Sequence, residues 1–156
     1  MSNESDNIDK TIRLGPLVDD STVAEEISGH DLAIVLSRYS IGSIELISEY
    51  KKGSRRAAKV LVRTTKGKYL LKRRALGRDG ISQVSFAHAV QRTLAEHRFP
   101  VAGLVEAVDG ETLVEHDGRI YELFSFMFGK RFDKSNPAAA ESGRILAHFH
   151  REFTYI

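Results

Sequence analysis

The stretch AKVLVRTTKGKYLLKRR, residues 58–74, carries the clearest structural pattern in this 156-residue chain. Every second residue from Ala58 to Val62 is apolar, and the turn sequence TKGK at 65–68 separates this run from a second apolar run that begins at Tyr69. Alternation with a period of two residues predicts strands, and a short link that contains glycine predicts a hairpin. The stretch therefore predicts two antiparallel strands side by side.

Before this hairpin in the sequence, the same alternation recurs at residues 43–50, and the three runs together predict a three-stranded meander. Further strands are predicted at residues 104–108, 112–116 and 119–128. Helical spacing of apolar residues predicts helices over residues 31–39, over residues 79–98 with Asp79 as the cap, and from Asn136 to about Glu152. Runs of strands with segregated helices are typical of an α+β domain, here an antiparallel sheet of about five strands with one flanking helix.

Positive charge is concentrated between residues 50 and 78. This segment holds twelve Lys or Arg and no Asp or Glu, whereas the rest of the chain holds 11 basic and 21 acidic residues. A segment of this kind is suited to contact anions.

The composition excludes several classes of protein. The chain has no cysteine, which rules out disulfides and thiolate metal sites. Residues 1–10 are polar and acidic, unlike a signal peptide, and no apolar stretch approaches the roughly 20 residues that span a bilayer. We therefore expect a soluble, cytoplasmic protein without a membrane partner.

Five short motifs resemble, in their order along the chain, the aminoglycoside phosphotransferase and choline-kinase-type family, which has a kinase-like fold. They are YSIG (39–42), KYLLKR (68–73), FPV (99–101), IYELFSFMFG (120–129) and GRILAHFH (143–150). The resemblance begins near residue 30 and implies the N-terminal lobe of that fold only. It implies a flexible arm at 1–28, a nucleotide-binding lobe at 29–129, and a linker with the first helix of a missing C-terminal lobe at 130–156.

The resemblance also implies where a nucleotide binds. Lys72 matches the strand lysine that reaches the phosphates of ATP. Leu70 precedes it by two residues on the same face of the strand, where it would cover the adenine. A solvated surface lysine is the competing interpretation, but a charge on an otherwise apolar strand face costs free energy unless it is used.

Two further segments complete the implied site. The turn at 52–57 lies where the family covers the phosphates, and its candidate residues are Gly53, Ser54 and Arg55. An ordinary hairpin turn fits the same residues equally well. Ser125, Phe126 and Met127 match the hinge, whose main-chain N–H and C=O groups would pair with adenine, although a buried strand also explains them.

The sequence departs from the family at the helix that follows Lys72. Kinases of this fold hold the phosphate-binding lysine with a carboxylate from this helix. Here the only acid between residues 80 and 98 is Glu96, which comes near the end. The family's position falls near Ala87 or His88, and the role of His88 stays open.

The second departure concerns catalysis. The family's catalytic loop, His-x-Asp with a following Asn, has no counterpart, because no His-x-Asp occurs in the chain. We therefore expect no catalytic residue here. The resemblance implies transfer of the γ-phosphate of ATP to a hydroxyl of a small molecule. The acceptor and Mg²⁺ would be bound by the missing lobe, and this chain would be a fragment that is inactive alone.

Two other functions remain open. The basic segment 51–78, with Tyr50 and Tyr69 stacking on bases, would suit a nucleic-acid-binding module, although a phosphate cleft explains the same charge. A non-catalytic interaction domain would expose the last helix and the phenylalanines of the strand at 119–128, which predicts self-association. His148 and Glu152 share one face of the last helix, a pattern more typical of surface residues than of a metal site.

Overall fold

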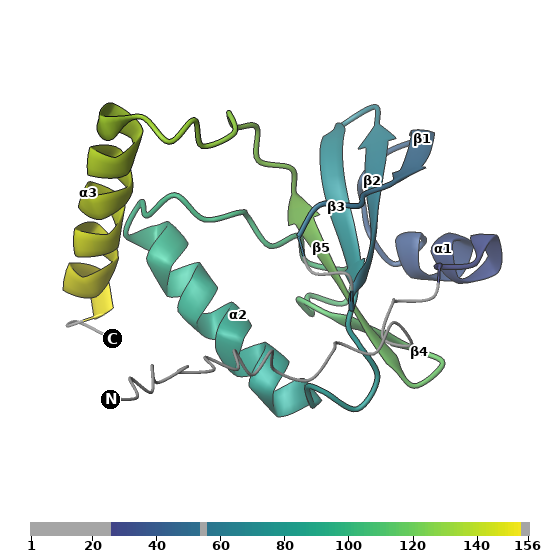
Figure 1. Ribbon diagram of the computed structural model, residues 1–156. Coiled ribbons are helices and arrows are strands. Elements are labelled where there is room, and N and C mark those ends of the chain that lie inside the picture. The colour runs from purple at the N-terminus through teal and green to yellow at the C-terminus, as the bar shows by residue number, and fades with distance from the viewer. Residues whose placement is uncertain (1–25, 54–55, 154–156) are drawn as a thin grey trace, which may run out of the picture.

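The described part of the chain, residues 26–53 and 56–153, forms one antiparallel sheet and three helices in a computed structural model (Figure 1). The strands lie in the order β1 (Ile44–Glu49), β2 (Ala58–Thr64), β3 (Gly67–Arg73), β5 (Arg119–Ser125) and β4 (Val114–His116). The helices are α1 (Gly29–Leu36), α2 (Ile81–Glu96) and α3 (Asn136–Phe153). The predicted α+β domain with a five-stranded antiparallel sheet is confirmed.

The two faces of the sheet have different surroundings. One face carries the hydrophobic core, in which Val62, Leu71 and Leu123 of three neighbouring strands are fully buried against Val35 and Leu36 of α1. The other face, which carries the residues between these positions, is turned toward α2. Figure 1 shows α1 and α2 on opposite sides of the sheet. The alternation seen in the sequence thus separates a core face from a second, more polar face.

Serine side chains cap two of the helices. The helix predicted at residues 31–39 begins earlier, at Gly29, and ends at Leu36. The Ser28 side chain accepts a hydrogen bond from the N–H of Asp31 and so caps α1. Ser135 does the same for α3, because its hydroxyl accepts from the N–H of Ala138 at 3.3 Å. Ile27, at the end of the predicted arm, is buried in the core.

Helix α3 lies beside the C-terminal end of α2 and away from the sheet (Figure 1). Phe99, just after α2, packs against Phe149 of α3 with their ring centroids 5.6 Å apart. The His97 ring also lies 2.6 Å from the Glu152 carboxylate. None of the helices in residues 26–53 and 56–153 is long and apolar enough to span a membrane.

Four local predictions of strands and caps were wrong. Residues 104–108 form no strand, only a bridge between Leu104 and Phe124, because the N–H of Ala107 turns away to the carbonyl of Glu111. The strand predicted at 119–128 ends at Ser125, and the strand predicted at 112–116 begins at Val114. Asp79 does not cap α2.

The cap of α2 is Gly80, which makes no side-chain hydrogen bond. Asp79 instead accepts a hydrogen bond from Arg74 at 2.6 Å. The acid before the helix is therefore used by a charged side chain at the end of β3, which binds a carboxylate more strongly than a backbone N–H does.

Candidate functional site

The face of the sheet toward α2 carries two adjacent rows of side chains. Residues that pair across antiparallel strands share a face. Lys59, Lys72 and Glu122 are successive partners on β2, β3 and β5 and form a charged row. In the same way, the next row is apolar and consists of Leu61, Leu70 and Phe124. The predicted pair of Leu70 and Lys72 thus lies on one face, each within its own row.

A buried carboxylate lies at the end of the charged row. Glu122 has no exposed surface. Its Oε2 lies 3.2 Å from Lys72 Nζ and accepts from Arg74 Nε at 2.8 Å. Its Oε1 accepts from Arg74 Nη2 at 2.8 Å and lies 2.7 Å from Nε2 of His88 on α2. The Arg74 contact is bidentate, the strongest geometry for a guanidinium and a carboxylate.

These contacts keep Glu122 ionised. Burial alone would raise its pKa, but hydrogen bonds from His88 and Arg74 and the charges of Lys72 and Arg74 lower the pKa to about 2. The pKa of Arg74 is raised, chiefly by its hydrogen bond to Glu122. Because Arg74 already satisfies both carboxylate oxygens, Lys72 contributes one longer contact and keeps 30% of its side chain exposed.

Lys59 lies next to Lys72 on the same face. Burial lowers the pKa of Lys59, and the positive charge of Lys72 lowers the pKa further. Two lysine side chains held this close repel each other, and an anion between them would relieve the repulsion. The row is therefore suited to bind a negatively charged group.

The turn after β1 approaches the same lysine. Lys59 Nζ donates to the carbonyl of Lys52 at 2.6 Å. Gly53 has a φ of +80°, and a Cβ there would lie 3.3 Å from Lys59 Nζ. The predicted Gly53 thus lies at the charged row in a conformation that favours glycine. The predicted Ser54 and Arg55 lie outside the described residues.

Two aromatic rings cover the apolar row. Tyr50 follows β1, Phe126 follows β5, and their ring centroids are 5.9 Å apart. Strands β2 and β3 lie between these two strands, and adjacent strands are about 4.8 Å apart. The two side chains therefore reach toward each other across Leu61 and Leu70. Phe126 also contacts Phe128, and Lys68 Nζ lies 5.2 Å from the centre of the Phe128 ring.

The three predicted hinge residues follow directly from β5, with Ser125 as its last residue. The N–H of Ser125 donates to Gly103 at 2.8 Å, and the N–H of Phe126 donates to Lys68 at 3.0 Å. Within the described residues, the Met127 N–H makes no such bond.

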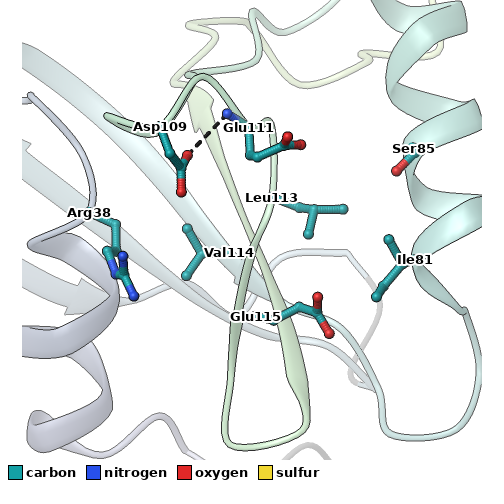
Figure 2. A pocket seen from close by; sticks show the side chains of 8 residues that line it. All are labelled: Arg38, Ile81, Ser85, Asp109, Glu111, Leu113, Val114 and Glu115. Atoms are coloured by element: carbon teal, nitrogen blue, oxygen red, sulfur yellow. Dashed lines mark hydrogen bonds between the residues drawn. The ribbon is translucent and has the colours of Figure 1, made fainter.

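Two pockets lie elsewhere on the molecule. One, of about 230 Å³, lies between Arg38, the start of α2 and residues 109–115 (Figure 2). Figure 2 shows its acidic side chains, Asp109, Glu111 and Glu115, around the apolar Ile81 and Leu113. The other, of about 240 Å³, lies between the C-terminal half of α2 and residues 102–106. Lys72 lines neither of these two pockets. The apolar row next to Lys72 lies under the rings of Tyr50 and Phe126.

The sequence analysis missed Glu122 and Lys59 as site residues. The available signal for Glu122 was an acid within a strand of apolar and aromatic residues, since such a buried charge needs a partner. Its partners lie 34 to 50 positions earlier in the sequence. Only the β3–β5 register and the packing of α2 bring them together. Among the described residues, no three His, Asp or Glu side chains lie close enough together to hold a metal ion.

Comparisons with known proteins bear on the family and the fold of the chain. The model of the phosphotransferase enzyme family matches residues 47–153. A crystal structure of an aminoglycoside phosphotransferase from Alicyclobacillus acidocaldarius superposes with a TM-score of 0.64 at 19% identity, over 87% of this chain and 38% of that chain. Spectinomycin phosphotransferase, crystallised with ADP and spectinomycin, gives a TM-score of 0.56 at 12% identity, over 70% and 32%.

At these identities the two structures establish the shared fold. The chain spans about a third of the length of each. A search of the curated proteins finds no match.

Proposed function

Since this chain belongs to the phosphotransferase enzyme family, we propose that it is the ATP-binding lobe of a kinase that phosphorylates a hydroxyl of a small molecule. The observation that carries the proposal is the pair of rows on the α2-facing side of the sheet. Lys59 and Lys72 would contact the phosphates, and the base would enter between the Tyr50 and Phe126 rings and the adjacent Leu61, Leu70 and Phe124.

The order of groups along this face suits a nucleotide. A base is flat and apolar on its faces, whereas the phosphates are anionic. The turn at Lys52 and Gly53 lies over Lys59, at the phosphate end. Tyr50 and Phe126 lie at the base end, where aromatic rings stack on a base with about 1–3 kcal/mol each. The Met127 N–H would donate to the edge of the base.

Magnesium fits this lobe poorly. Mg²⁺ prefers carboxylate oxygens and water. The carboxylate nearest Lys72 is Glu122, and within the described part of the chain both of its oxygens are engaged by Arg74 and His88. We propose that ligands for Mg²⁺ and the catalytic groups come from a further lobe, so that this chain binds the nucleotide but does not transfer phosphate alone.

The same further lobe would bind the acceptor. Spectinomycin phosphotransferase was crystallised with ADP and spectinomycin, and we expect a small-molecule acceptor for the complete enzyme. Helix α3 and the segment after β5 both carry exposed apolar side chains. Among them are Phe128, which is 75% exposed, and Leu146, which is 55% exposed. We propose that a further lobe or a second copy of the chain covers them.

Nucleic-acid binding is the second candidate, because of the basic segment 51–78. Its charges do not form one continuous surface. Arg63 is paired with Glu45 and Lys51 with Glu49, while Arg73 is buried in the opposite face of the sheet. This arrangement favours a small anionic ligand over a long phosphate backbone.

Calorimetric titration of ATP and ADP, each with Mg²⁺, into the whole chain tests the proposal. We expect saturable binding that Lys72→Ala weakens about tenfold or more, since contacts to charged groups contribute about 1.5–3 kcal/mol. Lys66→Ala is the matched control, because Lys66 belongs to the same basic segment but donates to Ser40 at the other end of the sheet.

Two results would overturn the proposal. One is the absence of binding at millimolar nucleotide, and the other is equal affinity for the wild type and Lys72→Ala. Tighter binding of a random single-stranded oligonucleotide than of ATP at physiological salt would favour the nucleic-acid function instead.

A further inference from the structure

We propose that Glu122 and His88 form a positioning pair for Lys72, in which Glu122 on β5 holds the lysine and His88 on α2 holds the carboxylate. The pair would replace the helix carboxylate with which kinases hold this lysine. This inference rests on the proposed role of Lys72 in nucleotide binding.

In that arrangement the carboxylate comes from the helix. Here the carboxylate comes from a strand, and the helix contributes a histidine that contacts it. Within the described residues of α2, the only acid is Glu96, whose side chain is exposed at the last residue of the helix. The position in the middle of α2 holds His88, which is 2% exposed. The carboxylate comes from Glu122, the direct cross-strand partner of Lys72. A strand pair fixes this distance more rigidly than a helix that packs on the sheet through side chains.

His88 is held at both ring nitrogens. Nε2 lies 2.7 Å from Glu122 Oε1, and Nδ1 lies 2.7 Å from the Thr112 hydroxyl. An ionised carboxylate only accepts hydrogen bonds, so Nε2 carries the proton. The Thr112 hydroxyl is the partner of Nδ1, so both ring nitrogens have a hydrogen-bond partner.

Charged groups surround His88 on the side of Glu122. Lys72 and Arg74 contact this carboxylate, and Asp79 accepts a hydrogen bond from Arg74. The His88 ring also lies edge-on to Phe124, with the centroids 6.3 Å apart. His88 thus contacts the charged row and the apolar row together.

The geometry explains why the orientation of Glu122 needs His88. Oε1 receives hydrogen bonds from His88 and Arg74, while Oε2 is shared by Arg74 and Lys72. Without His88, Oε1 keeps Arg74 as its partner and Oε2 keeps Arg74 and Lys72. The longer contact with Lys72 is then the first to be lost when the carboxylate rotates. His88 is therefore a positioning residue and would not touch the nucleotide phosphates.

A double-mutant cycle between positions 88 and 72 tests the proposal, with ADP affinity and urea stability measured on the whole chain. We expect His88→Leu, which removes both ring nitrogens, to weaken ADP binding about five- to tenfold in the wild-type background. In the Lys72→Ala background it should have no further effect on affinity. His88→Gln, which can still donate to Glu122, should recover most of the affinity. The ¹⁵N shifts of His88 at neutral pH should be those of the Nε2–H tautomer.

Several outcomes would overturn the positioning role. They are an equal loss of affinity from His88→Leu in both backgrounds, no rescue by glutamine, or an Nδ1–H tautomer. If the wild-type chain binds no nucleotide, the proposed function fails. The urea cycle still decides the positioning role in that case, because His88 and Lys72 should be coupled in stability through Glu122, and additive losses would contradict the proposal.

Discussion

Glu122 and Glu152 have the same partner chemistry in two different surroundings. Each carboxylate lies close to a histidine, at 2.7 Å for His88 and at 2.6 Å for His97. A second basic group lies beside each, Arg74 for Glu122 and His148 for Glu152. The pKa of Glu122 is lowered to about 2, and that of Glu152 is lowered, chiefly by the hydrogen bond from His97.

The difference lies in the access of water. The Glu122 side chain is 1% exposed, whereas the Glu152 side chain is 18% exposed and its partner His97 is 40% exposed. If a partner is lost, water can solvate Glu152 but cannot reach Glu122. The same pairing is therefore a strong constraint inside the sheet and a weak link between two helices.

Removing the buried carboxylate should have the largest effect. Glu122→Gln leaves Arg74 and Lys72 without their shared countercharge, and breaking a buried ion pair from one side costs about 3–5 kcal/mol. Urea denaturation measures this loss. Glu115→Gln, an exposed acid on the neighbouring strand β4, is the control and should change stability little. Equal losses in the two variants would contradict the difference between buried and exposed carboxylates.

Protonation of Glu122 at low pH should remove nearly as much stability as the Glu122→Gln substitution. The folded-state pKa of about 2 lies below the usual value of 4.5, so the stabilisation is complete above pH 4.5 and is lost as the pH falls toward 2. Its size is about 3 kcal/mol. Urea midpoints measured from pH 5 to pH 2 should fall more steeply in the wild type than in Glu122→Gln. Parallel curves for the wild type and Glu122→Gln would show that other acidic residues cause the loss of stability at low pH.

Weakening the bidentate contact should have an intermediate effect. Arg74→Lys keeps the charge but cannot donate to both oxygens of Glu122 and to Asp79 together, which should cost about 1–2 kcal/mol. The control is Arg63→Lys, whose contact with Glu45 is half-exposed. Thermal unfolding compares the two. A similar melting shift for both variants would mean that the fork geometry at Glu122 contributes nothing.

Removing the charge of Glu152, which contacts His97 and His148, should have the smallest effect. Glu152→Gln removes the charge between His97 and His148, but water replaces the lost contacts. The melting temperature should stay within the reproducibility of the measurement, while amide exchange becomes faster in the last turns of α3. Glu141→Gln, which affects only an exposed pair with Arg144, is the reference. A melting shift as large as that of Glu122→Gln would contradict the proposed difference between the buried Glu122 and the water-accessible Glu152.

The fold was largely predictable because its signals are local. Alternation of apolar residues along β2 and β3 depends on neighbours in sequence, as does the serine before α3. The error at residues 104–108 has the opposite cause. These residues have strand-like composition, but a strand needs a continuous partner, and the turn between Ala107 and Glu111 takes the chain away from β5.

The candidate site was predictable in part. The sequence selected Lys72 and Leu70, and the structure places them in adjacent rows of one face. The sequence does not indicate the partner of Lys72, because the resemblance points to a carboxylate on the following helix, whereas Glu122 lies 50 residues away on β5. Asp79 is predicted as a cap for a similar reason, since the sequence does not show that Arg74 reaches it.

Most of the strand and helix pattern, the basic segment and the resemblance to a kinase-like lobe are visible in the sequence alone. Which charged side chains meet depends on the folded arrangement. The register of β3 and β5 brings Lys72 opposite Glu122, and the packing of α2 brings His88 to the same carboxylate. Periodicity is a property of adjacent residues, whereas the pairing of buried charges depends on strand register and burial, which arise only when distant segments come together.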